Sequence, residues 1–174
     1  MKKDFMKAMF LMLCAVFAFT FTACSDDDDP VDDAATQVAG AYTGELNVYM
    51  TATGDEPIAT DTKTITLSKK TENTVDLVIN NFTLTVFTLP VELGNVTIPN
   101  CTLSGADGNY SFSGEVSLSN ITVPIVGQAD CKVQFTNAQV SGNTLALPLV
   151  IEVYQPGTTE DLGLGITANF TGTK

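Results

Sequence analysis

Residues 40–51 read GAYTGELNVYMT, and this stretch decides the fold. Small and apolar side chains fall on every second position, so an extended chain would carry them on one face and polar side chains on the other. The apolar face consists of Tyr42, Gly44, Leu46, Val48 and Met50. A period of two predicts a β-strand that is buried on one side.

The same alternation recurs along the rest of the chain. It is clearest in residues 110–119, YSFSGEVSLS, and in residues 145–153, LALPLVIEV. These segments are rich in residues that strands favour, and turn signals such as Gly142-Asn143 separate them. At Asn80-Asn81 the apolar positions slip by one residue, which predicts a β-bulge or a bend.

Together these segments predict an all-β fold. We find no convincing helical period after residue 23, and about eight to ten short antiparallel strands fit the spacing of the turns. Such a set of strands forms a sandwich or a small antiparallel β-barrel. A mature domain of roughly 150 residues buries enough surface to fold without disulfides or metals.

The start of the chain has the organisation of a cleaved N-terminal signal peptide. Three lysines precede an apolar run over residues 8–21, which is too short to span a bilayer but suits a signal sequence. The sequence FTAC at residues 21–24 resembles the lipobox of bacterial lipoproteins. The resemblance implies a signal peptide over residues 1–23 and lipidation of Cys24. An ordinary signal peptide without lipidation is the alternative.

An acidic run follows the candidate lipidation site, with Ser25, Asp26, Asp27, Asp28 and Asp29 in succession. It resembles the export signal of Bacteroidetes surface lipoproteins. This resemblance implies an outer-membrane protein held in the membrane by its lipid and displayed at the cell surface; the periplasmic face is the alternative location. Residues 24–37 as a whole are interpreted as an acidic tether, because charges of one sign repel and extend a chain.

Several segments of the mature domain resemble a known family. They are residues 38–44 (VAGAYTG), 81–84 (NFTL), 110–114 (YSFSG), 142–145 (GNTL) and 170–172 (FTG). In this order they are similar to the calycin-like β-barrel domain of secreted Bacteroidetes lipoproteins. The resemblance covers residues 38–174 and implies a small antiparallel barrel of lipocalin-like shape, in a family without an established activity.

Composition excludes several kinds of active site. The chain contains no His, so neither a Ser-His-Asp site nor a His-ligated zinc site can form. Its formal charge of −12 argues against binding to nucleic acid. Carboxylates in the predicted strands fall on the polar face, which argues against a buried acid–base pair. We therefore expect a protein that is not an enzyme, with no catalytic residues, no metal site and no cofactor.

Two cysteines remain in the mature domain besides Cys24. Cys101 and Cys131 both fall on the apolar face of their predicted strands. An oxidising compartment would permit a disulfide between them, and a pair of buried free thiols is an equally good interpretation. A bridge would require their Cα atoms to lie within about 7 Å.

These observations support three hypotheses about function. The first is a non-enzymatic surface protein that binds a glycan or an outer-membrane protein partner, or scaffolds an assembly; Tyr49, Tyr154 and residues 86–98 are its candidate binding surface. The second is a lipocalin-like carrier of a small apolar ligand, although the many predicted inward Leu, Ile, Val and Phe residues favour a filled barrel. The third, least favoured, is a glycan-acting enzyme that uses surface carboxylates.

Overall fold

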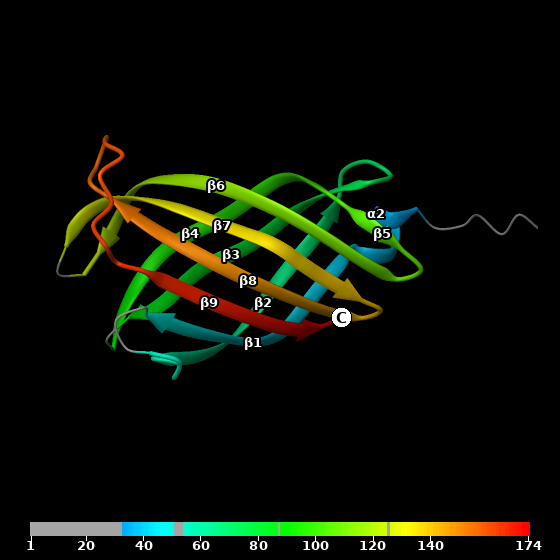
Figure 1. The fold of residues 1–174 in the computed structure, drawn as a ribbon, viewed down its shortest axis with the longest axis horizontal. Helices are drawn as coiled ribbons and strands as arrows, with labels where there is room; N and C mark the ends of the chain where they lie inside the picture. Colours follow the sequence, from blue (N-terminus) through cyan, green and yellow to red (C-terminus); the bar gives the residue numbers. More distant parts are fainter. Residues whose placement is uncertain (1–32, 51–53, 87, 125) are drawn as a thin grey trace, which may run out of the picture. The chain divides into compact units, whose positions relative to one another are not determined.

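An all-β domain occupies the part of the chain that the computed structural model describes, residues 33–50, 54–86, 88–124 and 126–174 (Figure 1). The chain divides into two units, and this domain belongs to the second, Asp32–Lys174. The predicted signal peptide, Cys24 and the acidic run Ser25–Asp29 lie outside the described residues.

Nine strands form one antiparallel sheet within the described residues, which confirms the predicted fold class. The strands are β1 (Gly40–Met50), β2 (Ala59–Lys69), β3 (Thr74–Val86), β4 (Leu89–Thr102), β5 (Ser104–Ala106), β6 (Asn109–Val123), β7 (Gly127–Ser141), β8 (Thr144–Tyr154) and β9 (Ile166–Thr173). Their order in the sheet is β4-β3-β2-β1-β9-β8-β7-β6-β5. The first long strand is therefore the neighbour of the last, with Gly44 opposite Gly172.

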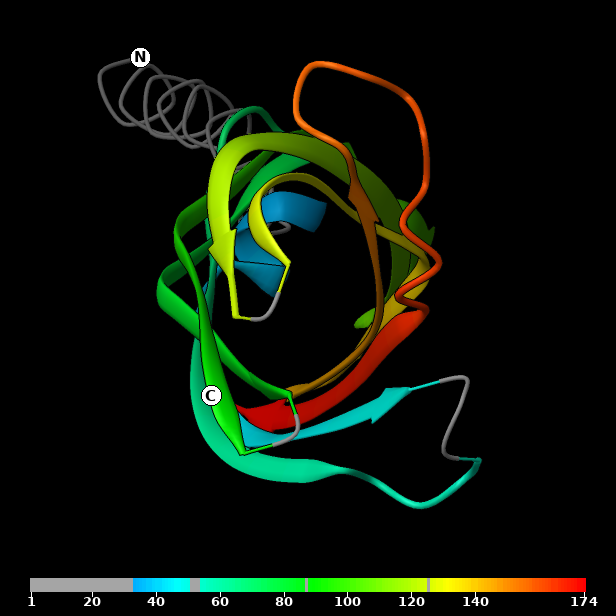
Figure 2. The same cartoon turned by 90° about the vertical axis from the view of Figure 1, so that its left-hand side faces the viewer.

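The sheet curls into a barrel with an apolar interior, as the end-on view of Figure 2 shows. In β1, Tyr42, Leu46, Val48 and Met50 are buried, as the alternation predicts. Between β4 and β6 the sheet stays open as far as the described residues show, since the ladder has β4 at one end and β5 at the other. Side chains close this gap, which we call the seam.

The strands β4 and β6 approach each other closely at Gly114 of β6. A Cβ atom added there would lie 2.6 Å from Ile98 Cγ2 and 3.0 Å from Cys101 Sγ, both on β4. It would also lie 3.1 Å from Phe135 of β7. Because ordinary carbon–carbon contacts are about 3.5–4.0 Å, any larger residue here would force the side chains of Ile98 and Cys101 to move. The absence of a side chain on β6 thus allows β4 to approach.

A short helix, α2 (Ala34–Val38), closes one end of the barrel and lies within the outline of the barrel in Figure 2. Asp33 caps it by accepting a hydrogen bond from Thr36 N at 2.8 Å, and Ala35 and Val38 are fully buried. The predicted tether over residues 24–37 included residues 34–37, which the structure places in this helix of the folded domain. Five residues are too few to display a helical period.

Contacts around Tyr42 seal the same end. Its hydroxyl donates to Val38 O at 2.7 Å, and burial raises the pKa of the phenol to about 12. Lys174 Nζ lies 5.5 Å from the centre of the Tyr42 ring and donates to the carbonyls of Gln37 and Ala39 at 2.6 and 3.0 Å. The end of the chain is thereby fastened to the segment that leads into β1.

Four asparagines with left-handed backbone conformation interrupt the hydrogen-bond ladders of two long hairpins, β3–β4 and β6–β7. They are Asn81 in β3, Asn100 in β4, Asn120 in β6 and Asn137 in β7, with φ of 50°, 56°, 60° and 57°. A register shift accompanies each of them, so they are β-bulges. The shift at Asn81 confirms the bulge predicted from the sequence.

A side chain on the opposite strand caps each bulge. The backbone N–H of Asn81 donates to Asn95 Oδ1 at 2.9 Å, and that of Asn100 donates to Asp76 Oδ1 at 2.8 Å. The N–H of Asn120 donates to Asp130 Oδ1 at 3.1 Å, and that of Asn137 donates to Ser113 Oγ at 3.1 Å. Each hairpin has one bulge near its turn and one near the end closed by α2. Since bulges increase strand twist, this repeated arrangement helps both hairpins to coil around the barrel.

Candidate functional site

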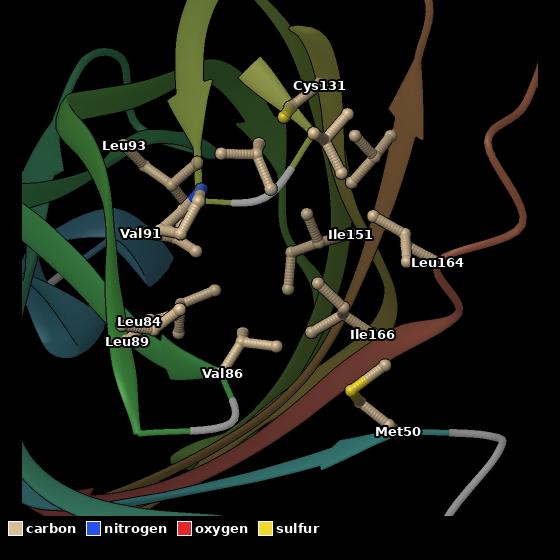
Figure 3. Close-up of a pocket in the computed structure, with 14 residues that line it drawn as sticks. Met50, Leu84, Val86, Leu89, Val91, Leu93, Cys131, Ile151, Leu164 and Ile166 are labelled. Atoms are coloured by element: carbon tan, nitrogen blue, oxygen red, sulfur yellow. The ribbon is translucent and has the colours of Figure 1, made fainter. Parts of the chain in front are cut away.

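An apolar cavity of about 190 Å³, the mouth cavity, lies at the end of the barrel opposite α2 (Figure 3). Its lining comes from the ends of seven strands and from the loops at this end of the barrel. The lining residues are Met50, Leu84, Val86, Leu89, Val91, Leu93, Val123, Pro124, Val126, Cys131, Ile151, Val153, Leu164 and Ile166. In Figure 3 the labelled side chains converge from opposite sides of the barrel on a common space.

The distribution of side-chain size along the barrel explains why this space remains. The buried aromatic residues of the described core are Tyr42, Phe82, Tyr110, Phe112, Phe135 and Phe170, and none of them lines the cavity. At the mouth, the described inward positions carry aliphatic residues, Met50 and Cys131, and no aromatic ring. The interior is therefore filled toward α2 and hollow at the mouth, which corrects the expectation of a filled barrel.

The lining side chains contain no nitrogen or oxygen atom, and their only heteroatoms are the sulfurs of Met50 and Cys131. Desolvation raises the pKa of the Cys131 thiol to about 11, so this group is neutral at physiological pH. Such a wall can exclude water from an apolar molecule, but it offers no side chain for acid–base or nucleophilic chemistry.

The rim of the mouth cavity exposes apolar side chains. Leu89, beside the β3–β4 turn, is 38% exposed, and Val126, in the β6–β7 turn, is 41% exposed. Both also line the cavity. The apolar wall thus continues to the surface between the tips of the two hairpins, where a molecule from solution could enter.

Asp130 positions the third part of the rim, the β8–β9 loop that contains Leu164. Its carboxylate accepts hydrogen bonds from Gly157 N at 2.8 Å and from Asn120 N at 3.1 Å. These two bonds hold the pKa of Asp130 below its usual value, and the bond from Gly157 has the larger effect. One side chain thereby joins the loop to the bulge in β6, next to Cys131 in the cavity wall. The sequence placed Asp130 on the polar face but gave no sign of this role.

The two candidate disulfide partners are free and buried thiols. Cys131 lies opposite Leu118 of β6, whereas Cys101 contacts the position of Gly114 on the same strand. Four residues of extended chain separate these two levels, or roughly 13 Å, which exceeds the reach of a disulfide. Of the two interpretations left open by the sequence, the structure therefore shows free thiols.

The other predicted surface residues have mixed positions. Tyr49 and Tyr154 are half-buried and do not line the mouth cavity. The hydroxyl of Tyr154 donates to Glu152 Oε2 at 2.7 Å, and this bond raises the pKa of the phenol. Residues 86–98 do contribute to the site, but through their inward side chains, among them Val91 and Leu93.

Two further observations concern only the described ranges. No helix in them is long and apolar enough to cross a membrane. The same ranges hold no group of three or more His, Cys, Asp or Glu side chains arranged to bind a metal ion.

Comparisons with known proteins place the fold in a family. Among solved structures, the chain is similar to one from Bacteroides fragilis described as a "putative outer membrane protein", with a TM-score of 0.49 and 17% identity over 80% of this chain. The chain spans about half of that protein, 52%, and nothing about function follows from so distant a likeness. No curated protein matches the chain. The calycin-like beta-barrel domain family matches residues 38–173, nearly the whole described domain, and the chain therefore belongs to that family.

Proposed function

We propose that this protein is a non-enzymatic binding protein that holds a small apolar molecule in the mouth cavity. The carrying observation is a cavity of about 190 Å³ whose lining side chains are apolar. Apolar cavities of about 150 Å³ remain dry and bind benzene, so this one has room for a single ring or a short alkyl chain. We therefore favour the carrier hypothesis over the hypothesis of binding or scaffolding through the outer surface.

The size of the cavity also limits the affinity. A ligand that buries about 200 Å² of apolar surface gains roughly 5 kcal/mol from the hydrophobic effect. Lost translational and rotational freedom opposes this gain, while contacts with the cavity wall add to it. We therefore expect dissociation constants of about 0.1–1 mM for minimal probes. A natural ligand that also contacts the rim would bind more tightly.

We further propose that Cys24 carries the lipid that attaches this domain to the outer membrane, with the domain exposed at the cell surface. The support is the lipobox-like sequence at residues 21–24 and the acidic run Ser25–Asp29. Protease treatment of intact cells tests the location. Digestion of the domain is expected, whereas protection until the outer membrane is opened would place it on the periplasmic face.

A pair of variants on one strand tests ligand binding. Ile151→Trp fills the mouth cavity, because Ile151 lines it and is 2% exposed. Val150→Trp is the matched control, because the neighbouring side chain is 38% exposed on the outer face. Toluene binding to the mature protein is measured by NMR chemical-shift titration, and melting curves establish that both variants fold.

The expected result is saturable toluene binding to the wild type and to Val150→Trp, and its loss in a folded Ile151→Trp. Absence of saturable binding to the wild type, or equal binding to all three proteins, would refute the proposal. Native mass spectrometry of protein purified gently from its own host then searches for the natural ligand. An added mass that disappears on denaturation would begin to identify it.

A further inference from the structure

We infer that the mouth cavity selects neutral or cationic apolar molecules with a short alkyl chain or a single ring, and that it rejects anionic amphiphiles such as fatty acids. This inference rests on the proposed function and adds the chemical class of the ligand. Three features carry it: the charges of the loops at the mouth, the positions of the lysines, and the volume of the cavity.

Every charged residue in the loops around the mouth is acidic. Four connections meet at this end of the barrel, and their described residues are 54–58, 88, 124, 126 and 155–165. In sequence, their charged residues are Asp55, Glu56, Glu160 and Asp161. Asp130, at the base of the last connection, adds another carboxylate to the same end. None of these residues lines the cavity, but together they make the electrostatic potential at this end of the barrel negative, and that potential acts on the charged head of a ligand seated there.

None of the five lysines in the described domain lines the mouth cavity. The chain contains no Arg, and three of its lysines, Lys69, Lys70 and Lys174, lie around the end closed by α2. Lys63 and Lys132 lie on β2 and β7, where they pair with carboxylates at 2.6 and 2.8 Å. A carboxylate head at the mouth would therefore meet like charges and no ready counter-ion. An ammonium head would be attracted by opposite charges, and a neutral hydroxyl head would be neither attracted nor repelled.

The cavity volume limits the apolar part of the ligand. Since about 150 Å³ accommodates the six carbons of benzene, about 190 Å³ accommodates roughly seven or eight carbons. Long acyl chains exceed this volume. Short-chain or single-ring amines and alcohols satisfy both the volume and the charge of the site.

Three probes with the same alkyl chain test the inference: octylamine, 1-octanol and octanoate, titrated into the mature protein at pH 7. At about 10 mM ionic strength we expect octylamine to bind at least ~10-fold more tightly than octanoate, with 1-octanol between them. At ~0.5 M salt the ratio should fall to about twofold to threefold, because exposed charges are screened. Competition with toluene establishes that each probe occupies the mouth cavity.

Charge-neutralising variants locate the cause. Combining Asp55→Asn, Glu56→Gln, Glu160→Gln and Asp161→Asn should bring octanoate to within about threefold of octylamine at low salt. The pair Glu160→Gln and Asp161→Asn alone should produce part of this change. Its matched control combines Glu72→Gln and Asp107→Asn, which remove two carboxylates from turns at the opposite end and should leave the ratio unchanged.

The outcomes separate this inference from the proposed function. If none of the three probes binds, or if the folded Ile151→Trp binds them as the wild type does, the proposed ligand site itself is refuted. If all three compete with toluene but octanoate binds as tightly as octylamine at low salt, the cavity binds ligands and the inferred charge selection is wrong. A ratio that changes equally in the mouth and control variants would also overturn the charge selection.

Discussion

Replacing Gly114 with alanine should destabilise the barrel at its seam. The added Cβ would lie 2.6 Å from Ile98 Cγ2, about 1 Å closer than a normal contact, and 3.0 Å from Cys101 Sγ. Both atoms belong to buried side chains with little freedom to move. Overpacking of this kind costs about 1–3 kcal/mol, while the lower entropy of the unfolded alanine chain offsets about 0.4–1 kcal/mol.

We therefore expect Gly114→Ala to lower the free energy of unfolding by about 1–2 kcal/mol and the melting temperature by roughly 3–8 °C. Urea denaturation followed by circular dichroism measures the change. Ser117→Ala, at an exposed position of the same strand, is the control and should stay within about 0.5 kcal/mol of the wild type. A Gly114→Ala protein as stable as this control would show that β4 and β6 do not meet, and the closed barrel inferred here would be wrong.

Four further predictions concern other parts of the domain. Tyr42→Phe leaves a buried carbonyl of α2 without its donor and should cost about 1–3 kcal/mol in urea denaturation, whereas an unchanged midpoint would contradict the hydrogen bond. Burial raises the Tyr42 pKa to about 12, above its usual value near 10, so this tyrosine contributes stability below about pH 10 that is lost toward pH 12. Phenolate absorbance should show the raised pKa directly, and ionisation of Tyr42 near pH 10 in the native protein would contradict it. Burial raises the pKa of the Cys101 thiol, which does not line the mouth cavity, to about 11, so a thiol reagent should label it only after unfolding; rapid labelling of Cys101 in the native protein would refute its burial. Asp130→Ala should speed proteolytic cleavage within residues 155–165 with little loss of global stability, because Gly157 loses its acceptor. The control Asp107→Ala should leave this cleavage unchanged. Equal cleavage of the two variants would refute the role of Asp130 in holding the loop.

The sequence revealed the strands because burial on one face requires alternation, as in β1. It revealed one bulge, at Asn81, because the alternating apolar positions shift there by one residue within a single strand-like segment. The other capped bulges depend on partners that are distant in sequence, such as Asp76 for Asn100, and single-residue patterns do not identify such pairs. The short helix α2 was missed because one turn has no period.

The candidate site was harder to predict than the fold. The inward parity identified most of its lining residues, including Ile151 and Ile166, but as parts of a filled core. Whether the interior is full depends on how side chains from seven strands meet across the barrel, and therefore on a register that only the folded sheet defines. The acidic loops are likewise far apart in sequence and gather at one end only through the topology.

The pairing of β1 with β9 has a consequence for the order of folding. Gly44 and Gly172 lie far apart in the sequence, yet they face each other in the same ladder. Their pairing closes a very long loop, and contacts of this kind slow the folding of β-proteins. Until residues 166–173 are available, β1 and β8 each present an unpaired edge, which is a template for aggregation. Because β9 follows the other strands of the sheet in the chain, it is synthesised after them and completes the ladder, and a truncation before residue 166 would prevent the native fold.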